Sequence, residues 1–203
     1  EGIRKIETID IECAQERGYR VKLLGITRYD KGFLSQRVHP AMIDRDLPIA
    51  GVMDGFNALV DDGDFIDRTF YQGRGAGEGP TASAVVADLI DIARGYSRPA
   101  FFMPASKLTQ AKAVSISERK GAYYVRFHVE DDAVVIADIT LHLESVSISV
   151  ETMLQKTTDR DGTIYVILVT NIITETTLKD VLNRINKLSS VLEEPLSIRI
   201  EKL

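Results

Sequence analysis

The stretch GRGAGEGPTASAVVADLIDIAR, residues 73–94, is the part of this sequence that most restricts the fold. Glycine occupies every second position from Gly73 to Gly79, and Pro80 and apolar residues at helical spacing follow. Proline suits the first turn of a helix, where its missing N–H would have had no intrahelical partner. The pattern predicts a glycine turn followed by a helix over 80–94, which ends at Gly95.

Such a turn can serve as a binding site, since glycines without Cβ expose backbone N–H groups and a helix N-terminus carries partial positive charge. A phosphate or a cofactor could lie against it. The stretch lacks the Gly-Lys-Ser/Thr of a P-loop, and Glu78 and Pro80 break the dinucleotide fingerprint. Two interpretations stay open here: an anion or cofactor site, and a tight strand-to-helix turn without a ligand.

Residues 122–203 change to a β-α-β-β-α-β pattern. Alternating residues predict strands at 124–129, 147–156, 164–170 and 196–200, with a turn at 159–162. Apolar residues at helical spacing predict helices over 134–143 and 178–188. This order is typical of the ferredoxin-like split βαβ fold.

The N-terminal part predicts a short helix and a hairpin-rich sheet. Thr8 is expected to cap a helix that runs to about Arg17 and stops at Gly18. Strands are expected at 19–29 and 33–38, a loop or short helix from His39, and a hairpin over 56–71. Residues 96–121 contain Pro99 and Pro104 and show no sustained period, so we expect a linker. Its apolar run 101–103 is expected to pack on one domain.

Composition excludes several classes. The 25 basic residues are scattered among 30 acidic ones, giving a net charge of −5 with no basic run, so no nucleic-acid partner is expected. The apolar runs fall short of the roughly 20 residues that a membrane-spanning helix needs. The single Cys13 cannot form an intrachain disulfide and fits a reducing, cytoplasmic location.

Few residues suggest chemistry of their own. The three histidines, His39, His128 and His142, are far apart in sequence and have no cysteine or carboxylate at ligand spacing, so we predict no metal site. Lys5, Lys22 and the pair Asp10 and Glu12 are interpreted as helix-capping or solvated charges. No catalytic residue is assigned.

The chain resembles bacterial homoserine dehydrogenases. The resemblance is carried by the stretch 73–94 and by EGIRKIETIDI (1–11), GYRVKLLGI (18–26), HPAMI (39–43) and VMDGFNA (52–58). It continues into a C-terminal domain of the ACT type. The resemblance implies an α+β fold with a substrate and dimerisation domain at 1–95, a linker at 96–121 and a ferredoxin-like ACT regulatory domain at 122–203.

The resemblance also implies a function. The family reduces aspartate semialdehyde to homoserine with NADPH or NADH, in threonine and methionine synthesis. Its Gly-Ala-Gly turn lies against the nicotinamide cofactor, which assigns cofactor binding to Gly75, Ala76 and Gly77. The subunits pair through the central sheet, so a homodimer is expected, or a tetramer if ACT domains also associate.

The sequence begins at Glu1, and no strand followed by Gly-x-Gly-x-x-Gly occurs in it. We therefore expect a C-terminal piece that lacks the Rossmann domain, binds no cofactor alone and is inactive alone. The alternative is a non-catalytic, ACT-containing regulatory or assembly module.

The ACT part departs from its family where amino-acid effectors bind. The usual Asp-Arg-Pro-Gly-Val-Leu is here DDAVVI (131–136), which puts Asp132 at the arginine position and Val134 at the glycine position. A Thr-His motif has become Thr170-Asn171. We expect little or no threonine binding and an ACT domain kept for packing and assembly.

Overall fold

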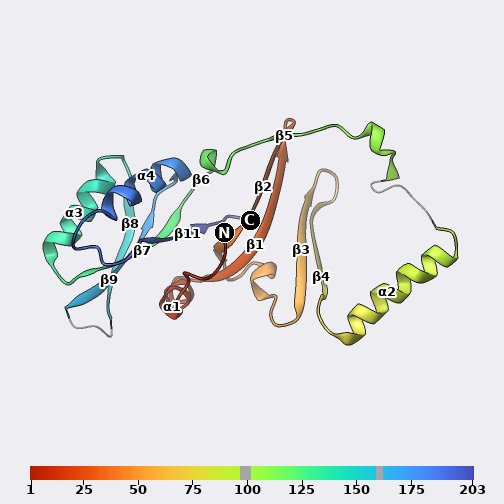
Figure 1. Ribbon diagram of the computed structural model, residues 1–203, viewed down its shortest axis with the longest axis horizontal. Helices are drawn as coiled ribbons and strands as arrows, with labels where there is room; N and C mark the ends of the chain where they lie inside the picture. The colour runs from red at the N-terminus through yellow and green to blue at the C-terminus, as the bar shows by residue number, and fades with distance from the viewer. Residues whose placement is uncertain (97–101, 159–161) are drawn as a thin grey trace. The chain divides into compact units, whose positions relative to one another are not determined.

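The computed structural model describes residues 1–96, 102–158 and 162–203. The chain divides into two compact units, the first formed by Glu1–Arg45 and Lys112–Leu203, the second by Asp46–Ala111. Figure 1 labels the helices and strands of both. The predicted run at 101–103 falls partly, and the predicted turn at 159–162 mostly, outside the described residues.

The first unit is built on one seven-stranded sheet. Its strand order is β1-β2-β11-β7-β9-β8, with β5 paired to β2. The strands are β1 (Tyr19–Asp30), β2 (Phe33–Asp44), β5 (Lys112–Ala113), β7 (Tyr123–Glu130), β8 (Val150–Thr157), β9 (Thr163–Thr170) and β11 (Leu196–Ile200). A separate two-stranded ladder joins β6 (Lys120–Gly121) to β10 (Ile173–Thr174).

The second half of this sheet has the predicted ferredoxin-like arrangement. Two helices, α3 (Ala133–Glu144) and α4 (Glu175–Ile185), alternate with β7, β8, β9 and β11 in the order βαββαβ. The antiparallel ladders β11–β7, β7–β9 and β9–β8 place the closing strand beside the first. The short β10 precedes α4. The α+β fold class and the ferredoxin-like topology are confirmed.

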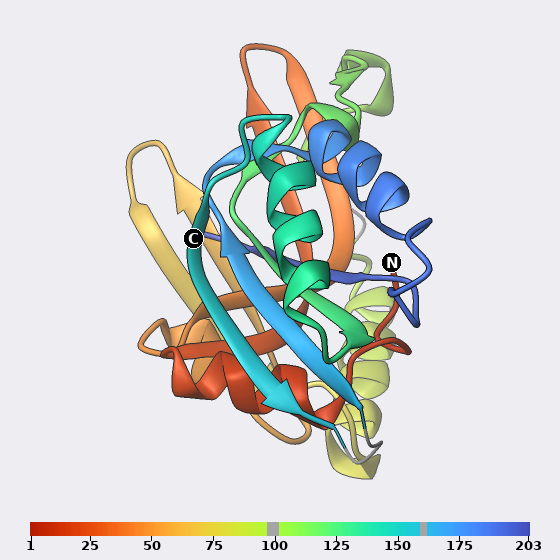
Figure 2. The ribbon, with the colours of Figure 1, turned by 90° about the vertical axis from the view of Figure 1, so that its left-hand side faces the viewer.

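The sheet has a core on each face because its central strands alternate apolar residues on both sides. On one face Val125, Phe127 and Val129 pack with α3 and α4, which lie side by side across the sheet in Figure 2. On the other face, Tyr124 and Ile167 pack in a cluster that includes Cys13 of α1 (Thr8–Glu16). The N-terminal helix therefore covers the face that the ferredoxin-like helices leave open.

The β1–β2 hairpin extends the sheet beyond β11. Its only ladder to β11 is parallel and joins Ala41 to Arg199 and Met42 to Ile200. The loop or short helix expected from His39 is wrong, since His39 and Pro40 lie inside β2, opposite β1. Proline is tolerated there because the ladder to β11 begins only at Ala41, so Pro40 has no ladder partner on that side.

The starts of α1 and α2 differ slightly from expectation, and α4 lies three residues earlier than the expected 178–188. The N-cap of α1 is Glu7, one residue before Thr8, and its backbone N–H donates to the Asp10 side chain in a capping box. The glycine-turn helix α2 runs from Glu78 to Ala93, so it starts two residues before the expected position. The cap of α1 is thus a capping box between Glu7 and Asp10, and the N-cap of α2 is Gly77.

The second unit contains the hairpin of β3 (Phe56–Gly63) and β4 (Asp67–Arg74), which leads into α2. Short 3-10 turns lie at Pro48–Gly51 and Ala105–Lys107, and another at Ile116–Glu118 belongs to the first unit. The described part of the predicted linker is not structureless, since Lys112–Ala113 and Lys120–Gly121 join ladders. The division at 95 and 122 stays a prediction.

Candidate functional site

The predicted site residues Gly75, Ala76 and Gly77 form the turn between β4 and α2. The backbone N–H of Gly75 donates to the Gly55 carbonyl at 3.2 Å, which closes the turn against the start of β3. Gly77 is the N-cap of α2, and its carbonyl accepts from the Thr81 hydroxyl at 2.8 Å. The three residues thus lie at a helix N-terminus, as the sequence pattern predicts.

Two of the four alternating glycines differ from the others in their local geometry. Gly77 has φ +123°, a conformation that residues with a side chain rarely adopt. A Cβ on Gly75 would lie 1.5 Å from the Asn57 amide nitrogen, so the backbone there packs directly on that side chain. Gly73 and Gly79 have open space around them. The backbone turn therefore explains Gly77 without any ligand, whereas the clash at Gly75 involves only the Asn57 side chain, which is exposed and can rotate away.

The helix that follows presents its apolar side chains to solvent. None of its residues is buried, and Val85, Leu89 and Ile92 are 54%, 60% and 72% exposed. An apolar surface of this size on a helix is typical of an interface. The described residues of the second unit leave this helix uncovered.

The histidines are held by structural contacts. His39 is buried, with its Nδ1 2.9 Å from the Pro40 carbonyl and its Nε2 3.5 Å from a Glu201 oxygen. His128 contacts Glu193 at 3.0 Å, and His142 contacts the Asp138 carbonyl at 2.8 Å. Within residues 1–96, 102–158 and 162–203, no three potential metal ligands gather at one place.

The loop at which ACT domains would bind an effector is occupied by its own contacts. The Asp132 carboxylate accepts from the Val134 backbone N–H at 2.9 Å and caps α3. Thr170 accepts from the Tyr123 N–H at 3.1 Å, and the Asn171 side chain accepts from the Ser149 N–H at 3.1 Å. Val134, at the position of the usual glycine, is 62% exposed.

Sequence reasoning missed three buried clusters of charge in the first unit. Arg126 donates to Asp10, Arg199 donates to Glu175, and Arg37 and Arg119 both donate to Glu201. Asp10 was expected to be a capping or solvated charge: it does cap α1, but it is fully buried. The available signal was arginine at inward-facing strand positions, because such residues are rarely buried without a partner.

Burial and neighbouring charges shift the pKa values of Glu201 and Cys13. Burial alone would raise the pKa of Glu201, but its contacts with His39 and the charges of Arg119 and Arg37 lower it to about 2. Desolvation raises the pKa of the Cys13 thiol, which keeps it in the neutral form and does not suit a nucleophile.

Together, the ferredoxin-like half, the long hairpin and the glycine turn define an α+β protein whose C-terminal half has the ACT type of topology. The family model for homoserine dehydrogenase matches residues 1–90. The homoserine dehydrogenase of Pseudomonas aeruginosa is 34% identical over 210 residues, covering 100% of this chain and 48% of the relative. That of Helicobacter pylori is 37% identical over 202 residues, covering 99% and 47%.

A solved structure agrees with the sequence relatives. The crystal structure of a homoserine dehydrogenase from Thiobacillus denitrificans superposes with a TM-score of 0.82 at 35% identity, covering 99% of this chain and 47% of that one. The chain belongs to the homoserine dehydrogenase family, and it spans about half the length of the curated relatives it matches. Among the helices of the described residues, none is long and apolar enough to cross a membrane.

Proposed function

We propose that this chain forms the C-terminal part of an NAD(P)-dependent homoserine dehydrogenase, which interconverts aspartate semialdehyde and homoserine in threonine and methionine synthesis. One observation carries the proposal: relatives named homoserine dehydrogenase align along the whole chain at 34% and 37% identity. Each of them is about twice as long as the aligned region. The other half of the enzyme is then the nucleotide-binding half.

In this proposal, the turn of Gly75, Ala76 and Gly77 lies against the nicotinamide cofactor. The support is geometric: the turn has no Cβ at Gly75 or Gly77, and it begins a helix whose positive end favours an anionic group. The cofactor would carry the hydride, and these residues would position it.

We also propose the division into a substrate and dimerisation domain at 1–95 and an ACT domain at 122–203, in a cytoplasmic homodimer or tetramer. Exposed apolar residues support assembly, since Leu23 on β1 and Leu59 on β3 are 54% and 61% exposed. Arg126 and Arg199 of the ACT part bond to Asp10 and Glu1 of the N-terminal part. The two proposed domains would therefore be tied by two ion pairs, of which Arg126–Asp10 is buried on both sides.

The test is to fuse the nucleotide-binding half of the Thiobacillus denitrificans enzyme ahead of this chain and assay homoserine oxidation with NADP and with NAD. We expect turnover from the fusion and none from the chain alone, since the proposal assigns most of the cofactor binding to the nucleotide-binding half. Turnover by the chain alone would contradict the expectation that it is inactive without the nucleotide-binding half. A folded fusion without turnover would instead favour a non-catalytic regulatory or assembly module.

A further inference from the structure

A cavity of about 200 Å³ in the first unit lies among an excess of positive charge. It is lined by residues of β1, β2, the segment before β7 and the chain end. Those that carry charge are Arg28, Arg37, Arg119, Lys120, Glu118 and Glu201. Glu118 and Lys120 are exposed at its rim, and Arg119 is stacked on the Tyr123 ring at 5.0 Å.

Three guanidinium groups share one buried carboxylate in this cavity. Glu201 lies 3.0 Å from Arg119, 3.2 Å from Arg37 and 4.0 Å from Arg28. The side chains of Arg37, Arg119 and Glu201 are only 7%, 8% and 4% exposed. Burying a charge is costly unless an opposite charge compensates it. One carboxylate leaves this cluster with uncompensated positive charge.

The buried arginines also have donors left over. Arg37 uses its terminal nitrogens on Ser35 and Glu201, while its Nε–H has no hydrogen-bond partner among the described residues. Arg119 uses Nε on Glu201 and Nη2 on the Ile200 carbonyl, and its Nη1 is likewise without a partner in that part of the chain. Buried polar groups are seldom left unsatisfied, so each such donor is free to bind a water or an anion.

We propose that this cavity is a binding site for a small oxyanion, a phosphate group or a small carboxylate, held by the Arg37 and Arg119 donors with Arg28 and Lys120 at the rim. Guanidinium groups match the oxygens of both anions in geometry. The volume of about 200 Å³ holds an anion of a few heavy atoms. All of its lining residues belong to the first unit, whereas the glycine turn belongs to the second.

The site would join parts of the chain that are distant in sequence. Arg28 and Arg37 come from the β1–β2 hairpin, whereas Arg119 and Glu201 precede and follow the ferredoxin-like half. An anion that binds all of them stabilises the contact between that hairpin and the ferredoxin-like half. Anion binding should therefore raise the thermal midpoint of the first unit.

The experiment is calorimetric titration of the 203-residue chain with inorganic phosphate, with acetate and with chloride, at constant ionic strength. We expect saturable binding of phosphate, acetate or both, and none of chloride. Whichever of phosphate and acetate binds with higher affinity identifies the preferred ligand as a phosphate group or a carboxylate. The assay contains no cofactor and no substrate, so its result is independent of the dehydrogenase proposal.

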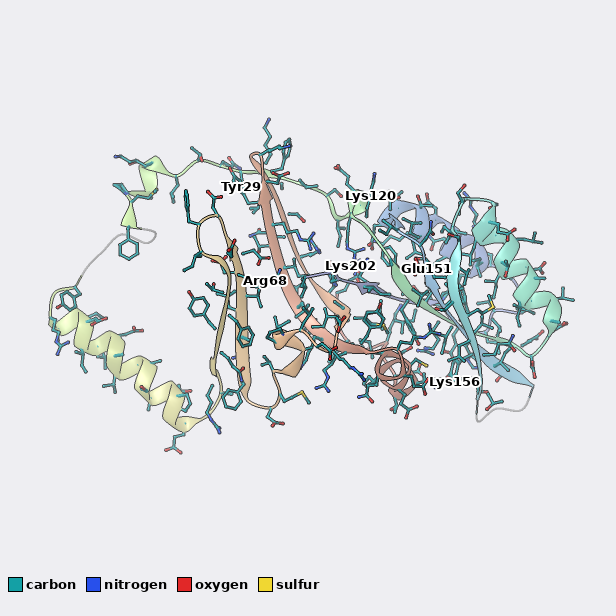
Figure 3. The ribbon with its side chains drawn as sticks, turned by 180° about the vertical axis from the view of Figure 1, so that it is seen from behind. Tyr29, Arg68, Lys120, Glu151, Lys156 and Lys202 are labelled. Atoms are coloured by element: carbon teal, nitrogen blue, oxygen red, sulfur yellow. The ribbon has the colours of Figure 1, made fainter. Side chains whose placement is uncertain are left out.

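Three variants locate the site. Arg37→Gln should weaken binding about tenfold, because a charge-assisted hydrogen bond is lost. Arg28→Gln should weaken it about threefold, and since the Arg28 side chain is 58% exposed, this variant tests the site even if Arg37→Gln fails to fold. The matched control is Lys156→Gln on β8, at the opposite edge of the sheet, which removes the same charge and should leave binding unchanged. Figure 3 labels Lys120, at the rim of the cavity, and the control residue Lys156 on β8.

Several results would overturn the proposal. One is a chloride response equal to that of phosphate and acetate, which would mean general screening. Another is equal binding by the parent chain and by Arg28→Gln and Arg37→Gln. A third is the absence of binding by any oxyanion, which would mean that water alone satisfies the two arginine donors.

Discussion

The guanidinium Nε of Arg126 on β7 donates to an oxygen of Asp10 on α1 at 2.9 Å, although 116 positions separate the two residues. The same carboxylate oxygen accepts from the Tyr124 hydroxyl at 2.8 Å, and the other oxygen accepts from the Glu7 N–H at 2.9 Å. Asp10 thus caps its own helix and fixes that helix to the sheet. The cluster is buried, with Asp10 0% and Arg126 5% exposed.

Asp10→Ala should therefore destabilise the chain by about 3 kcal/mol, because it leaves the buried Arg126 guanidinium with only the half-exposed Glu7 as its carboxylate partner. Urea unfolding followed by circular dichroism measures the loss. Glu12→Ala on the same helix is the matched control, since Glu12 is exposed, and should change stability by less than about 0.5 kcal/mol. Similar losses in both variants would show that the buried pair adds nothing beyond helix propensity.

The lowered pKa of Glu201 makes stability depend on pH. Its pKa falls from 4.5 to about 2 in the folded chain, so the folded state favours the ionised form. The stabilisation is present in full above pH 4.5 and is lost as pH falls toward 2, by roughly 3 kcal/mol in total. Unfolding curves between those pH values test this, and Glu201→Gln should flatten the dependence. An unchanged slope in that variant would assign the acid sensitivity to other carboxylates.

Gly77→Ala should impair the glycine turn, because alanine at φ +123° is strained. A strain of about 1–3 kcal/mol at the cofactor turn corresponds to a loss of roughly five- to hundredfold in kcat/KM of the fusion enzyme. Gly79→Ala is the control two residues later, where a Cβ meets nothing within 4 Å. Equal activity of the two variants would place the turn away from the reaction.

Threonine should not bind with micromolar affinity. Asp132 puts a negative charge where the family has arginine and is committed to capping α3, and Val134 adds a side chain where the family has glycine. Calorimetry with threonine should give only heats of dilution. A variant with Asp132→Arg, Ala133→Pro and Val134→Gly should gain binding if the loop alone decides. Saturable binding of threonine by the parent chain would show that the effector binds without the arginine and glycine that the family has in this loop.

The chain should form at least a dimer at low micromolar concentration, as measured by light scattering. Leu23 on β1 is 54% exposed, although its strand neighbours Leu24 and Ile26 are buried or nearly so, which leaves an apolar residue on the open face. Leu23→Lys should shift the mass toward the monomer. Lys187→Glu, at an exposed position after α4, should not. A monomeric parent chain would contradict the proposed assembly.

Local pattern determined much of this protein. Alternation in β7 and β9 and the apolar stripe of Leu178, Val181 and Leu182 were enough to predict the ferredoxin-like half, because strand and helix periods are properties of a few adjacent residues. The glycine turn was predicted for the same reason, since positive φ at Gly77 is a local requirement. The cofactor role of that turn came from resemblance and stays a proposal.

The tertiary structure alone decided which charges are buried together. Nothing near Asp10, Glu175 or Glu201 in the sequence identifies Arg126, Arg199 or Arg37 as its partner. It also decided that His39 and Pro40 lie in a strand, because their partners on β1 fix the extended backbone. Such pairings depend on ladders and packing between residues far apart in the chain, and local periodicity carries no information about which distant segments will meet.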